Sequence, residues 1–361
     1  MNPMHDLRML NLVRLWHASA WAVLLVLGSG LRPAVADPPR VSAEIASRRN
    51  CVVVTPGGPR DGGDFGPLTP GTKTSGIQEA LDQAKAMAKD VYLCGGSWTA
   101  EKTTPVVYHL QETLHVPWMQ NFRLDSGHCV INYDRKTGDA VVFDSQMSCY
   151  YRFGLIVSAA DGAVVRLRPT SKGPDRFKVI TTSEFHFNAL VGGGGAWPGG
   201  EPYNSKIDQA HTWHGIGLAL DGKQASINGN DIQVIEIVGC NRGIELTGNC
   251  TNNWIRAPLV HLCQNHLVVG SPTGRGVRAN RIEAFMNSEG IANSLGALVY
   301  GEANFLTLSV GTIAPKKGLI LKKPAKGNLI MAANLAGNIT NETSPRDNLL
   351  LGAGMLPPSR K

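Results

Sequence analysis

The sequence has few charged or aromatic side chains. Only 17% of its 361 residues are charged and 6% are aromatic, whereas 41 are glycine. A chain that turns so often and builds its core from aliphatic side chains favours many short strands over a helix bundle. Basic runs with interleaved aromatic residues are missing, which argues against a nucleic-acid partner. Cys-x-x-Cys pairs and Cys/His zinc spacings are missing too, so no metal ligands are assigned.

Long hydrophobic runs are also missing, apart from one near the N-terminus. Arg8 and Arg14 precede an apolar run at residues 20–27, and a small-x-small cleavage motif ends at Ala36. This run is shorter than the roughly 20 residues that span a bilayer. We therefore predict a signal peptide over residues 1–36 rather than a retained anchor. The mature chain is then expected to lack stable membrane insertion and to work in the periplasm, at the cell surface or outside the cell.

The net charge carries little functional information. The formal charge of the whole chain is +7, and removal of the predicted signal peptide lowers it to about +5. A mildly cationic exported protein suits an acidic polymer such as a uronate-containing glycan. Ordinary solubility charge explains the same value more simply.

Seven cysteines lie beyond the predicted cleavage site, and an odd number excludes complete internal pairing. Cys51 and Cys94 each sit in a predicted short strand near the N-terminus, which makes them a candidate disulfide. Cys240 and Cys263 each stand three residues before the start of a strand pattern, so we expect them to stack in adjacent coils as small buried side chains.

The region after a short leader at residues 37–50 has its own organisation. Residues 51–54 read as a strand, followed by a Gly/Pro-rich loop. Ser75 and Gln78 have capping-box spacing, and an apolar face runs from Ile77 to Ala88 at helical intervals. A helix of this kind protects the open end of a stack of strands. We predict a cap over residues 51–120.

From residue 121 to residue 352 the pattern becomes repetitive. An asparagine, one further residue and an aliphatic recur at steps of 23, 27, 24 and 24 residues, and Gly-led alternating aliphatic strands recur between them. The asparagines are Asn230, Asn253, Asn280, Asn304 and Asn328. A period in the twenties without helical patterning indicates one coil of strands per repeat, and the leucine content is too low for leucine-rich repeats. Asparagine suits tight turns, and stacked asparagines can form a hydrogen-bonded ladder with a structural role.

The chain resembles the pectate-lyase-like superfamily, in particular the branch whose N-terminal cap is like that of rhamnogalacturonases and phage tailspikes. The residues that carry the resemblance are Asp64-Phe65-Gly66, Gly76-Ile77-Gln78-Glu79-Ala80-Leu81, Val91-Tyr92-Leu93 with Gly95 and Gly96, and Thr113-Leu114-His115-Val116-Pro117. The resemblance implies an all-β, single-stranded right-handed parallel β-helix with an N-terminal amphipathic capping helix. Two departures stand out: the Asp-rich stretch before the helix is Thr-Pro-Gly-Thr-Lys-Thr, and the Pro-Pro-Gly turn is Cys-Gly-Gly. Lyases, hydrolases, epimerases and adhesins share this cap.

In that superfamily the substrate cleft usually runs along one sheet, with reactive groups pointing outward. Alternation places Val165 and Leu167 inside and therefore Arg166 and Arg168 outside. By the same rule, Glu245 points outward between two aliphatic neighbours.

A uronate lyase or epimerase needs a cation to neutralise the sugar carboxylate and a base to take the proton. Arg166, Arg168 and Arg242 are candidates for the cation, and His214 is a candidate base. Glu245 completes the predicted catalytic set. Each of these side chains also suits a plain solvated surface role. Other members of the superfamily use calcium to neutralise the sugar carboxylate, but no Asp/Glu cluster that could hold calcium is evident in the sequence.

A glycoside hydrolase needs two carboxylates about 5–9.5 Å apart. Aligning the strand that begins at Gly215 with the strand that begins at Gly243 puts Gly217 beside Glu245 in the preceding coil and Val268 beside it in the next. The outward column then lacks a second carboxylate, which weakens the hydrolase interpretation. The residue set that marks polygalacturonases is absent as well.

The period breaks over residues 185–214, a Gly-rich stretch that contains Trp197, Tyr203 and Trp213. We predict an inserted loop here whose aromatic side chains stack on sugar rings, with a variable surface loop as the alternative. Asn265, at the start of a predicted strand, joins this substrate-binding set. Residues 353–361 are expected to form a C-terminal tail.

We therefore expect an exported polysaccharide-active protein that acts on an acidic glycan by β-elimination or epimerisation. The first alternative is a non-catalytic β-helix for surface attachment or glycan binding, and the second is a hydrolase of polygalacturonase type. The expected partner is a polysaccharide. The expected assembly is a monomer or a homotrimer.

Overall fold

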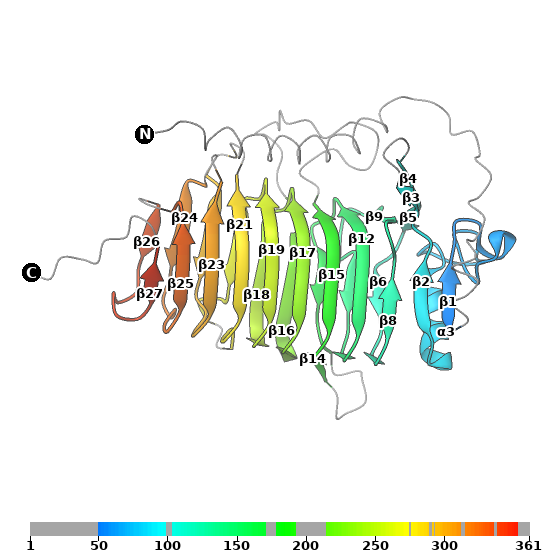
Figure 1. Ribbon diagram of the computed structural model, residues 1–361, viewed down its shortest axis with the longest axis horizontal. Helices are drawn as coiled ribbons and strands as arrows, with labels where there is room; N and C mark the ends of the chain where they lie inside the picture. The colour runs from blue at the N-terminus through cyan, green and yellow to red at the C-terminus, as the bar shows by residue number, and fades with distance from the viewer. Residues whose placement is uncertain are drawn as a thin grey trace, which may run out of the picture.

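The computed structural model describes residues 50–98, 103–170, 178–192, 214–273, 276–288, 291, 293–311, 315–335 and 338–352. Over most of this length the chain alternates between two long parallel sheets, so that each coil adds a strand to each sheet. The coils are stacked along the long axis of the molecule, from β1 at one end to β26 and β27 at the other (Figure 1). This architecture is compatible with a parallel β-helix and confirms the repeat that the sequence predicts.

The first sheet has 13 strands in the order β1-β2-β8-β12-β15-β17-β19-β21-β23-β25-β27, with β5 and β9 pairing beside β12. Every pairing in it is parallel. Its strands are β1 (Cys51–Val54), β2 (Asp90–Leu93), β5 (Val107–Leu110), β8 (Arg123–Asp125), β9 (Val130–Tyr133), β12 (Tyr150–Ser158), β15 (Glu184–Val191), β17 (Asp231–Val238), β19 (Trp254–His261), β21 (Arg281–Asn287), β23 (Phe305–Val310), β25 (Leu329–Ala333) and β27 (Leu349–Leu351).

The second sheet has 12 strands in the order β26-β24-β22-β20-β18-β16-β13-β10-β6, with β7, β11 and β14 beside this path. Its strands are β6 (Leu114–Val116), β7 (Met119–Gln120), β10 (Val141–Phe143), β11 (Gln146–Met147), β13 (Ala163–Leu167), β14 (Val179–Thr181), β16 (Ile216–Asn228), β18 (Arg242–Thr251), β20 (Asn265–Val269), β22 (Leu295–Val299), β24 (Lys317–Leu321) and β26 (Ile339–Asn341). A separate antiparallel pair consists of β3 (Gly96–Trp98) and β4 (Thr103–Pro105).

The helix α3 (Ile77–Met87) packs against β1, β2 and β6, at the end of the stack where the first sheet begins (Figure 1). The predicted buried face is confirmed at Ile77 and Leu81, both fully buried. The predicted capping box is wrong. The N–H of Gln78 donates to Thr74 Oγ1, while the Ser75 hydroxyl donates to the His109 carbonyl at 2.8 Å. Ser75 has a φ of 54°, so the chain is still turning there and the helix begins two residues later.

A further difference concerns the end of that helix. Ala88, which the helical spacing places on the buried face, is exposed. Its φ of 50° makes it the residue that ends the helix, and its N–H bonds the Ala84 carbonyl. A left-handed residue at this position is a common way to satisfy the last carbonyls of a helix.

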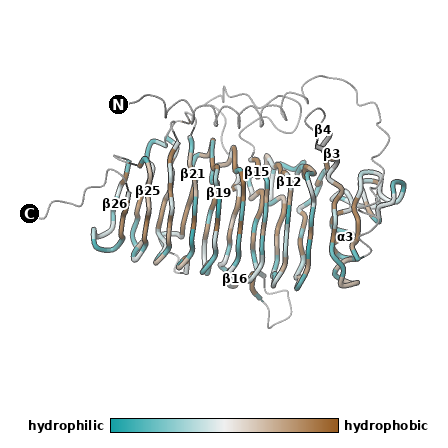
Figure 2. Tube along the Cα trace, in the orientation of Figure 1, coloured by the Kyte–Doolittle hydropathy of each residue, from teal (hydrophilic) through white to brown (hydrophobic). Residues whose placement is uncertain are grey.

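The core lies between the two sheets and is filled by alternate residues of every strand. Figure 2 shows apolar and polar positions alternating along the coils. Near the N-terminal third the core is aromatic, with Tyr151 stacked on Phe185 at 5.2 Å and Phe153 on Phe187 at 5.6 Å between ring centroids. Farther along it becomes aliphatic. Residues paired in adjacent coils thus place like side chains above one another.

The predicted asparagine ladder is confirmed and extends one rung further than the sequence pattern shows, to Asn348. Each Nδ2 donates to the Oδ1 of the next rung, at 2.8 to 3.1 Å, over Asn230, Asn253, Asn280, Asn304, Asn328 and Asn348. The physical reason differs from the one expected. The left-handed conformation belongs to the residue before several of these rungs, such as Asn252, Ala279 and Ala303. The ladder side chain itself points inward and replaces missing backbone partners.

Of the two predictions for the cysteines, one is correct and one is wrong. Cys240 and Cys263 are fully buried in the core, as expected, and the Gln264 N–H donates to the Cys240 carbonyl, which places the two segments in adjacent coils. The disulfide expected between Cys51 and Cys94 does not form. The register of β1 and β2 pairs Cys51 with Asp90 and Val54 with Leu93, so the two cysteines lie at opposite ends of the pair.

No helix within the described residues is long and apolar enough to cross a membrane. The predicted signal peptide at residues 1–36, most of the leader and the tail at residues 353–361 lie outside the described residues.

Candidate functional site

The outward face of the second sheet carries a charged cluster over its early coils. The strand register places Arg166 of β13 beside Ala219 of β16, and Ala219 beside Glu245 of β18. Two residues further along the strands, Asp221 pairs with Thr247. Alternation therefore puts Arg166, Asp221 and Glu245 on one face, as predicted for Arg166 and Glu245.

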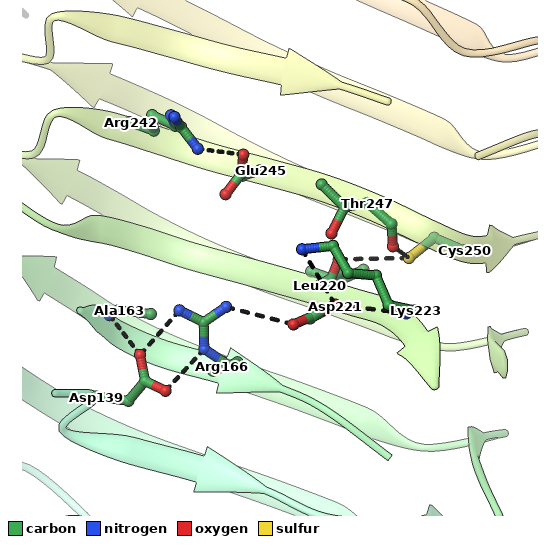
Figure 3. Close-up of polar contacts among 10 residues, drawn as sticks. All are labelled: Asp139, Ala163, Arg166, Leu220, Asp221, Lys223, Arg242, Glu245, Thr247 and Cys250. Atoms are coloured by element: carbon green, nitrogen blue, oxygen red, sulfur yellow. Dashed lines mark hydrogen bonds and ion pairs between the residues drawn. The ribbon is translucent and has the colours of Figure 1, made fainter. Parts of the chain in front are cut away.

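Arg166 is the centre of this cluster. Its Nε and one terminal nitrogen donate to the two carboxylate oxygens of Asp139, at 2.8 and 2.9 Å, and its other terminal nitrogen lies 3.7 Å from Asp221 Oδ2 (Figure 3). The side chains of Arg166, Asp139 and Asp221 are only 16%, 13% and 15% exposed. A bidentate Arg–carboxylate pair at this depth is fixed in position.

The electrostatics of the pair follow from its burial and its hydrogen bonds. Burial alone would raise the pKa of Asp139, but hydrogen bonds from the Arg166 side chain and the Ala163 N–H, with the charge of Arg166, hold that pKa below its ordinary value. Burial would likewise lower the pKa of Arg166, yet hydrogen bonding to Asp139 and the charges of Asp221 and Glu245 raise it. Both groups are charged at neutral pH.

Glu245 lies at the other side of the cluster. Its carboxylate accepts a short hydrogen bond from Arg242, three residues earlier on β18 (Figure 3). The Glu245 side chain is 14% exposed, whereas that of Arg242 is 45% exposed. Lys223 closes the cluster from outside, with its ammonium 3.9 Å from Asp221 Oδ1. Arg242 and Lys223 are therefore the cations that solvent reaches.

The register of β16 and β18 shows that the expected alignment, which left Glu245 without a second carboxylate nearby, is wrong. The glycine that pairs with Gly243 is Gly217, since Ile216 pairs with Arg242 and Leu218 with Ile244. The strands are thus offset by two residues from the expected alignment, and Ala219 rather than Gly217 stands beside Glu245. Asp221 pairs with Thr247, two residues after Glu245, so this face does hold a second carboxylate on the neighbouring strand.

The remaining predicted residues are less closely grouped. Arg168 follows Arg166 by two residues, is half-buried, and helps to lower the pKa of Asp139. Asn265 pairs with Arg242, but its Nδ2 bonds Asn241 at 3.4 Å. His214 is exposed, and its carbonyl accepts the N–H of Asn241 at 3.3 Å, the residue before Arg242. The structure therefore places the backbone of His214 beside the Arg242 end of the cluster, five residues before Ala219.

The predicted inserted loop is only partly described. Residues 184–191 form the regular strand β15, so the stretch from Phe185 to Val191 belongs to a coil rather than to an insertion. Trp197, Tyr203 and Trp213 lie outside the described residues. Among the residues that are described, no group of three or more His, Cys, Asp or Glu side chains is arranged to hold a metal ion.

Sequence reasoning missed Asp139, Asp221 and Lys223. One signal was available for Asp139, because it lies three residues before Val142, which pairs with Arg166 in the next coil, and it precedes an alternating strand as a turn residue does. Asp221 was hidden by the two-residue offset of β16 against β18. Lys223 follows Asp221 at the start of an irregularity in that pairing, between Gly222 and Ile227, which the coil period does not reveal.

Comparison with family models, with curated proteins and with solved structures gave no match to this chain. The function is therefore inferred from the geometry of the site alone.

Proposed function

We propose that this chain is an exported, right-handed parallel β-helix of the pectate-lyase-like kind, closed at its first coil by α3, and that it cleaves a polysaccharide by hydrolysis on the outer face of the second sheet. The observation that carries the proposal is the pair formed by Asp221 and Glu245, half-buried carboxylates on neighbouring strands of that face.

The backbone spacing of this pair is compatible with glycoside hydrolysis. One strand step of about 4.8 Å sideways and two residues of about 3.3 Å each along the strand separate the two backbone positions by about 8 Å. Two carboxyl groups about 6.5–9.5 Å apart leave room for a water molecule and are typical of inverting hydrolases. One carboxyl then protonates the leaving oxygen while the other activates that water.

The state of Arg166 favours hydrolysis over elimination. A uronate lyase needs a cation that is free to bind the sugar carboxylate, but Arg166 is already held by Asp139 in a bidentate pair and faces Asp221 as well. Its role in the proposed site is to position Asp221. Arg242, which is the more exposed cation, is available to a substrate but lies beside Glu245.

The test is an assay of the mature protein against a panel of neutral and acidic polysaccharides, with Asp221→Asn and Glu245→Gln as variants. We expect new reducing ends from at least one polymer and a loss of about 10²–10⁴-fold in kcat in each variant, since general acid–base groups contribute rates of this size. Lys85→Ala, an exposed change on α3, is the matched control and keeps full rate.

Three outcomes separate the alternatives. An unsaturated product that absorbs in the ultraviolet supports β-elimination and contradicts hydrolysis. Binding with no new chain end, no unsaturated product and no change in uronate configuration supports a non-catalytic surface or glycan-binding protein, whereas a changed configuration alone supports epimerisation. Full activity in both Asp221→Asn and Glu245→Gln removes the assignment of this site.

A further inference from the structure

A hollow of about 530 Å³ lies at the edge of the carboxylate cluster, where Asn249 packs against Gly222, the residue after Asp221. It is lined by Asn249, Gly276, Arg278, Glu302, Pro324 and Lys326. Isolated parallel bridges join Thr251 to Arg278, Arg278 to Glu302, and Glu302 to Lys326. The hollow therefore runs along a column of residues that pair from one coil to the next, and this column lies beside the asparagine ladder.

The backbone around the hollow is held rigidly. The N–H of Arg278 donates to the Cys250 carbonyl at 3.0 Å, and the N–H of Glu302 donates to Val277 at 2.9 Å. Gly276 has a φ of 124°, and a Cβ at this position would come within 2.9 Å of the Gly248 carbonyl oxygen. A side chain here would strain the turn, so glycine keeps this wall open.

The charged groups of the hollow are only partly neutralised. Lys326 Nζ lies 3.7 Å from Glu302, with the lysine side chain 65% exposed. Arg278 is exposed, and its guanidinium has no hydrogen-bond or ion-pair partner among the described residues. Two coil steps separate Arg278 from Lys326, which is about 10 Å of backbone. The lining thus carries two cations around one carboxylate.

We propose that this hollow binds an oxyanion substituent, a carboxylate or sulfate, of a polysaccharide chain that lies along the column. The Arg278 fork matches a planar or tetrahedral oxyanion, Lys326 adds a second positive charge, and Glu302 accepts hydroxyl hydrogen bonds that a sugar supplies. The lining holds no aromatic side chain on which a nucleotide base stacks, so a glycan suits it better than a nucleic acid. The lining does not include Asp221 or Glu245, although Asn249 lies two residues after Thr247, the strand partner of Asp221.

The test measures binding of the full mature chain to polygalacturonate, to dextran sulfate and to neutral dextran by affinity electrophoresis. We expect retardation by one or both anionic polymers and none by neutral dextran. The double variant R278A/K326A should weaken anionic binding at least about tenfold, since hydrogen bonds to charged groups are the strong ones. Which anionic polymer responds shows whether carboxylate or sulfate is preferred. Glu302→Gln should tighten binding, because it removes the carboxylate and leaves the fold's backbone bonds in place.

K85A/K136A is the matched control, since it removes two exposed positive charges outside the hollow. An equal loss of affinity in this control shows a general charge effect and overturns the proposal. Tighter binding to duplex DNA than to either glycan overturns it in favour of a nucleic acid. Asp221→Asn that abolishes cleavage but keeps polymer retardation separates this site from the proposed hydrolytic one.

Discussion

The ladder side chain Asn280 is predicted to be one of the most destabilising single positions to truncate. It is 1% exposed. Its Oδ1 accepts from both the N–H and the Nδ2 of Asn253, and its Nδ2 donates to Asn304 Oδ1 and to the Cys250 carbonyl. Asn280→Ala removes these bonds at once, in the middle of the stack.

The loss of stability depends on which hydrogen-bond partners of Asn280 keep another hydrogen bond after the substitution. The Cys250 carbonyl still accepts from Arg278, and Asn304 Oδ1 still accepts from the N–H of residue 280. The Asn253 N–H is left buried with no partner, which costs about 1–3 kcal/mol. The other lost hydrogen bonds contribute about 0.5–1.5 kcal/mol each, less where a second bond remains. We expect the free energy of unfolding to fall by about 3 kcal/mol.

The assay is urea unfolding followed by circular dichroism, with Gln120→Ala as the control. Gln120 is an exposed amide at the edge of the second sheet, and its truncation should change the free energy of unfolding by less than about 0.5 kcal/mol. A loss below about 1 kcal/mol for Asn280→Ala, at an unchanged slope against urea, would refute the view that the ladder supplies buried partners that water cannot replace.

Four further predictions concern ionisable groups. Arg166→Ala leaves the half-buried Asp139 carboxylate without its main partner, so the free energy of unfolding should fall by about 2–4 kcal/mol in urea titrations; a loss as small as a surface change contradicts this. The pKa of Asp139 is lower in the folded protein than in the unfolded chain, so its carboxylate stabilises the fold fully above about pH 3.9. This stabilisation is lost as pH falls through the folded pKa. Asp139→Asn should remove that loss from the acid side of a plot of unfolding free energy against pH. Burial lowers the pKa of His266, although its hydrogen bonds to the Leu295 and Asn287 carbonyls partly raise it. The free energy of unfolding should therefore decline as pH falls below about 6.5, and His266→Gln should make that decline smaller in melting curves. Burial raises the pKa of Cys129 to about 12, so an alkylating reagent should label this thiol only in denaturant; rapid native labelling contradicts the buried position.

The inward and outward positions of the strands could be predicted from the sequence because alternation has a period of two and one face is buried. Val165, Leu167, Ile244 and Leu246 are all fully buried, as alternation requires. The asparagine ladder was predictable for a similar reason, since a residue repeated once per coil at one turn must stack on itself. These features depend on local pattern alone.

The register between coils could not be read in the same way. Gly215 and Gly217 both precede an alternating aliphatic stretch, so the sequence does not show which of them lies beside Gly243 in the next coil. In the structure it is Gly217, where an added Cβ would come within 2.7 Å of the Gly243 carbonyl oxygen. That choice determines whether Glu245 faces a second carboxylate. The Asp139–Arg166 pair was missed because it joins a turn residue to the strand of the following coil. Helix capping failed for a comparable reason, since Ser75 is used by His109 from a distant strand.

The asparagine ladder also bears on how a chain of this kind changes length in evolution. Successive rungs lie 23, 27, 24, 24 and 20 residues apart, from Asn230 to Asn348, and each donates to the following rung. A deletion that runs from one rung to the next would join two equivalent turns and leave a complete, shorter stack, whereas a deletion of half that length would leave every later amide out of phase. We therefore expect deletions of whole coils to be tolerated, and the rungs mark where such a cut leaves the rest of the stack intact.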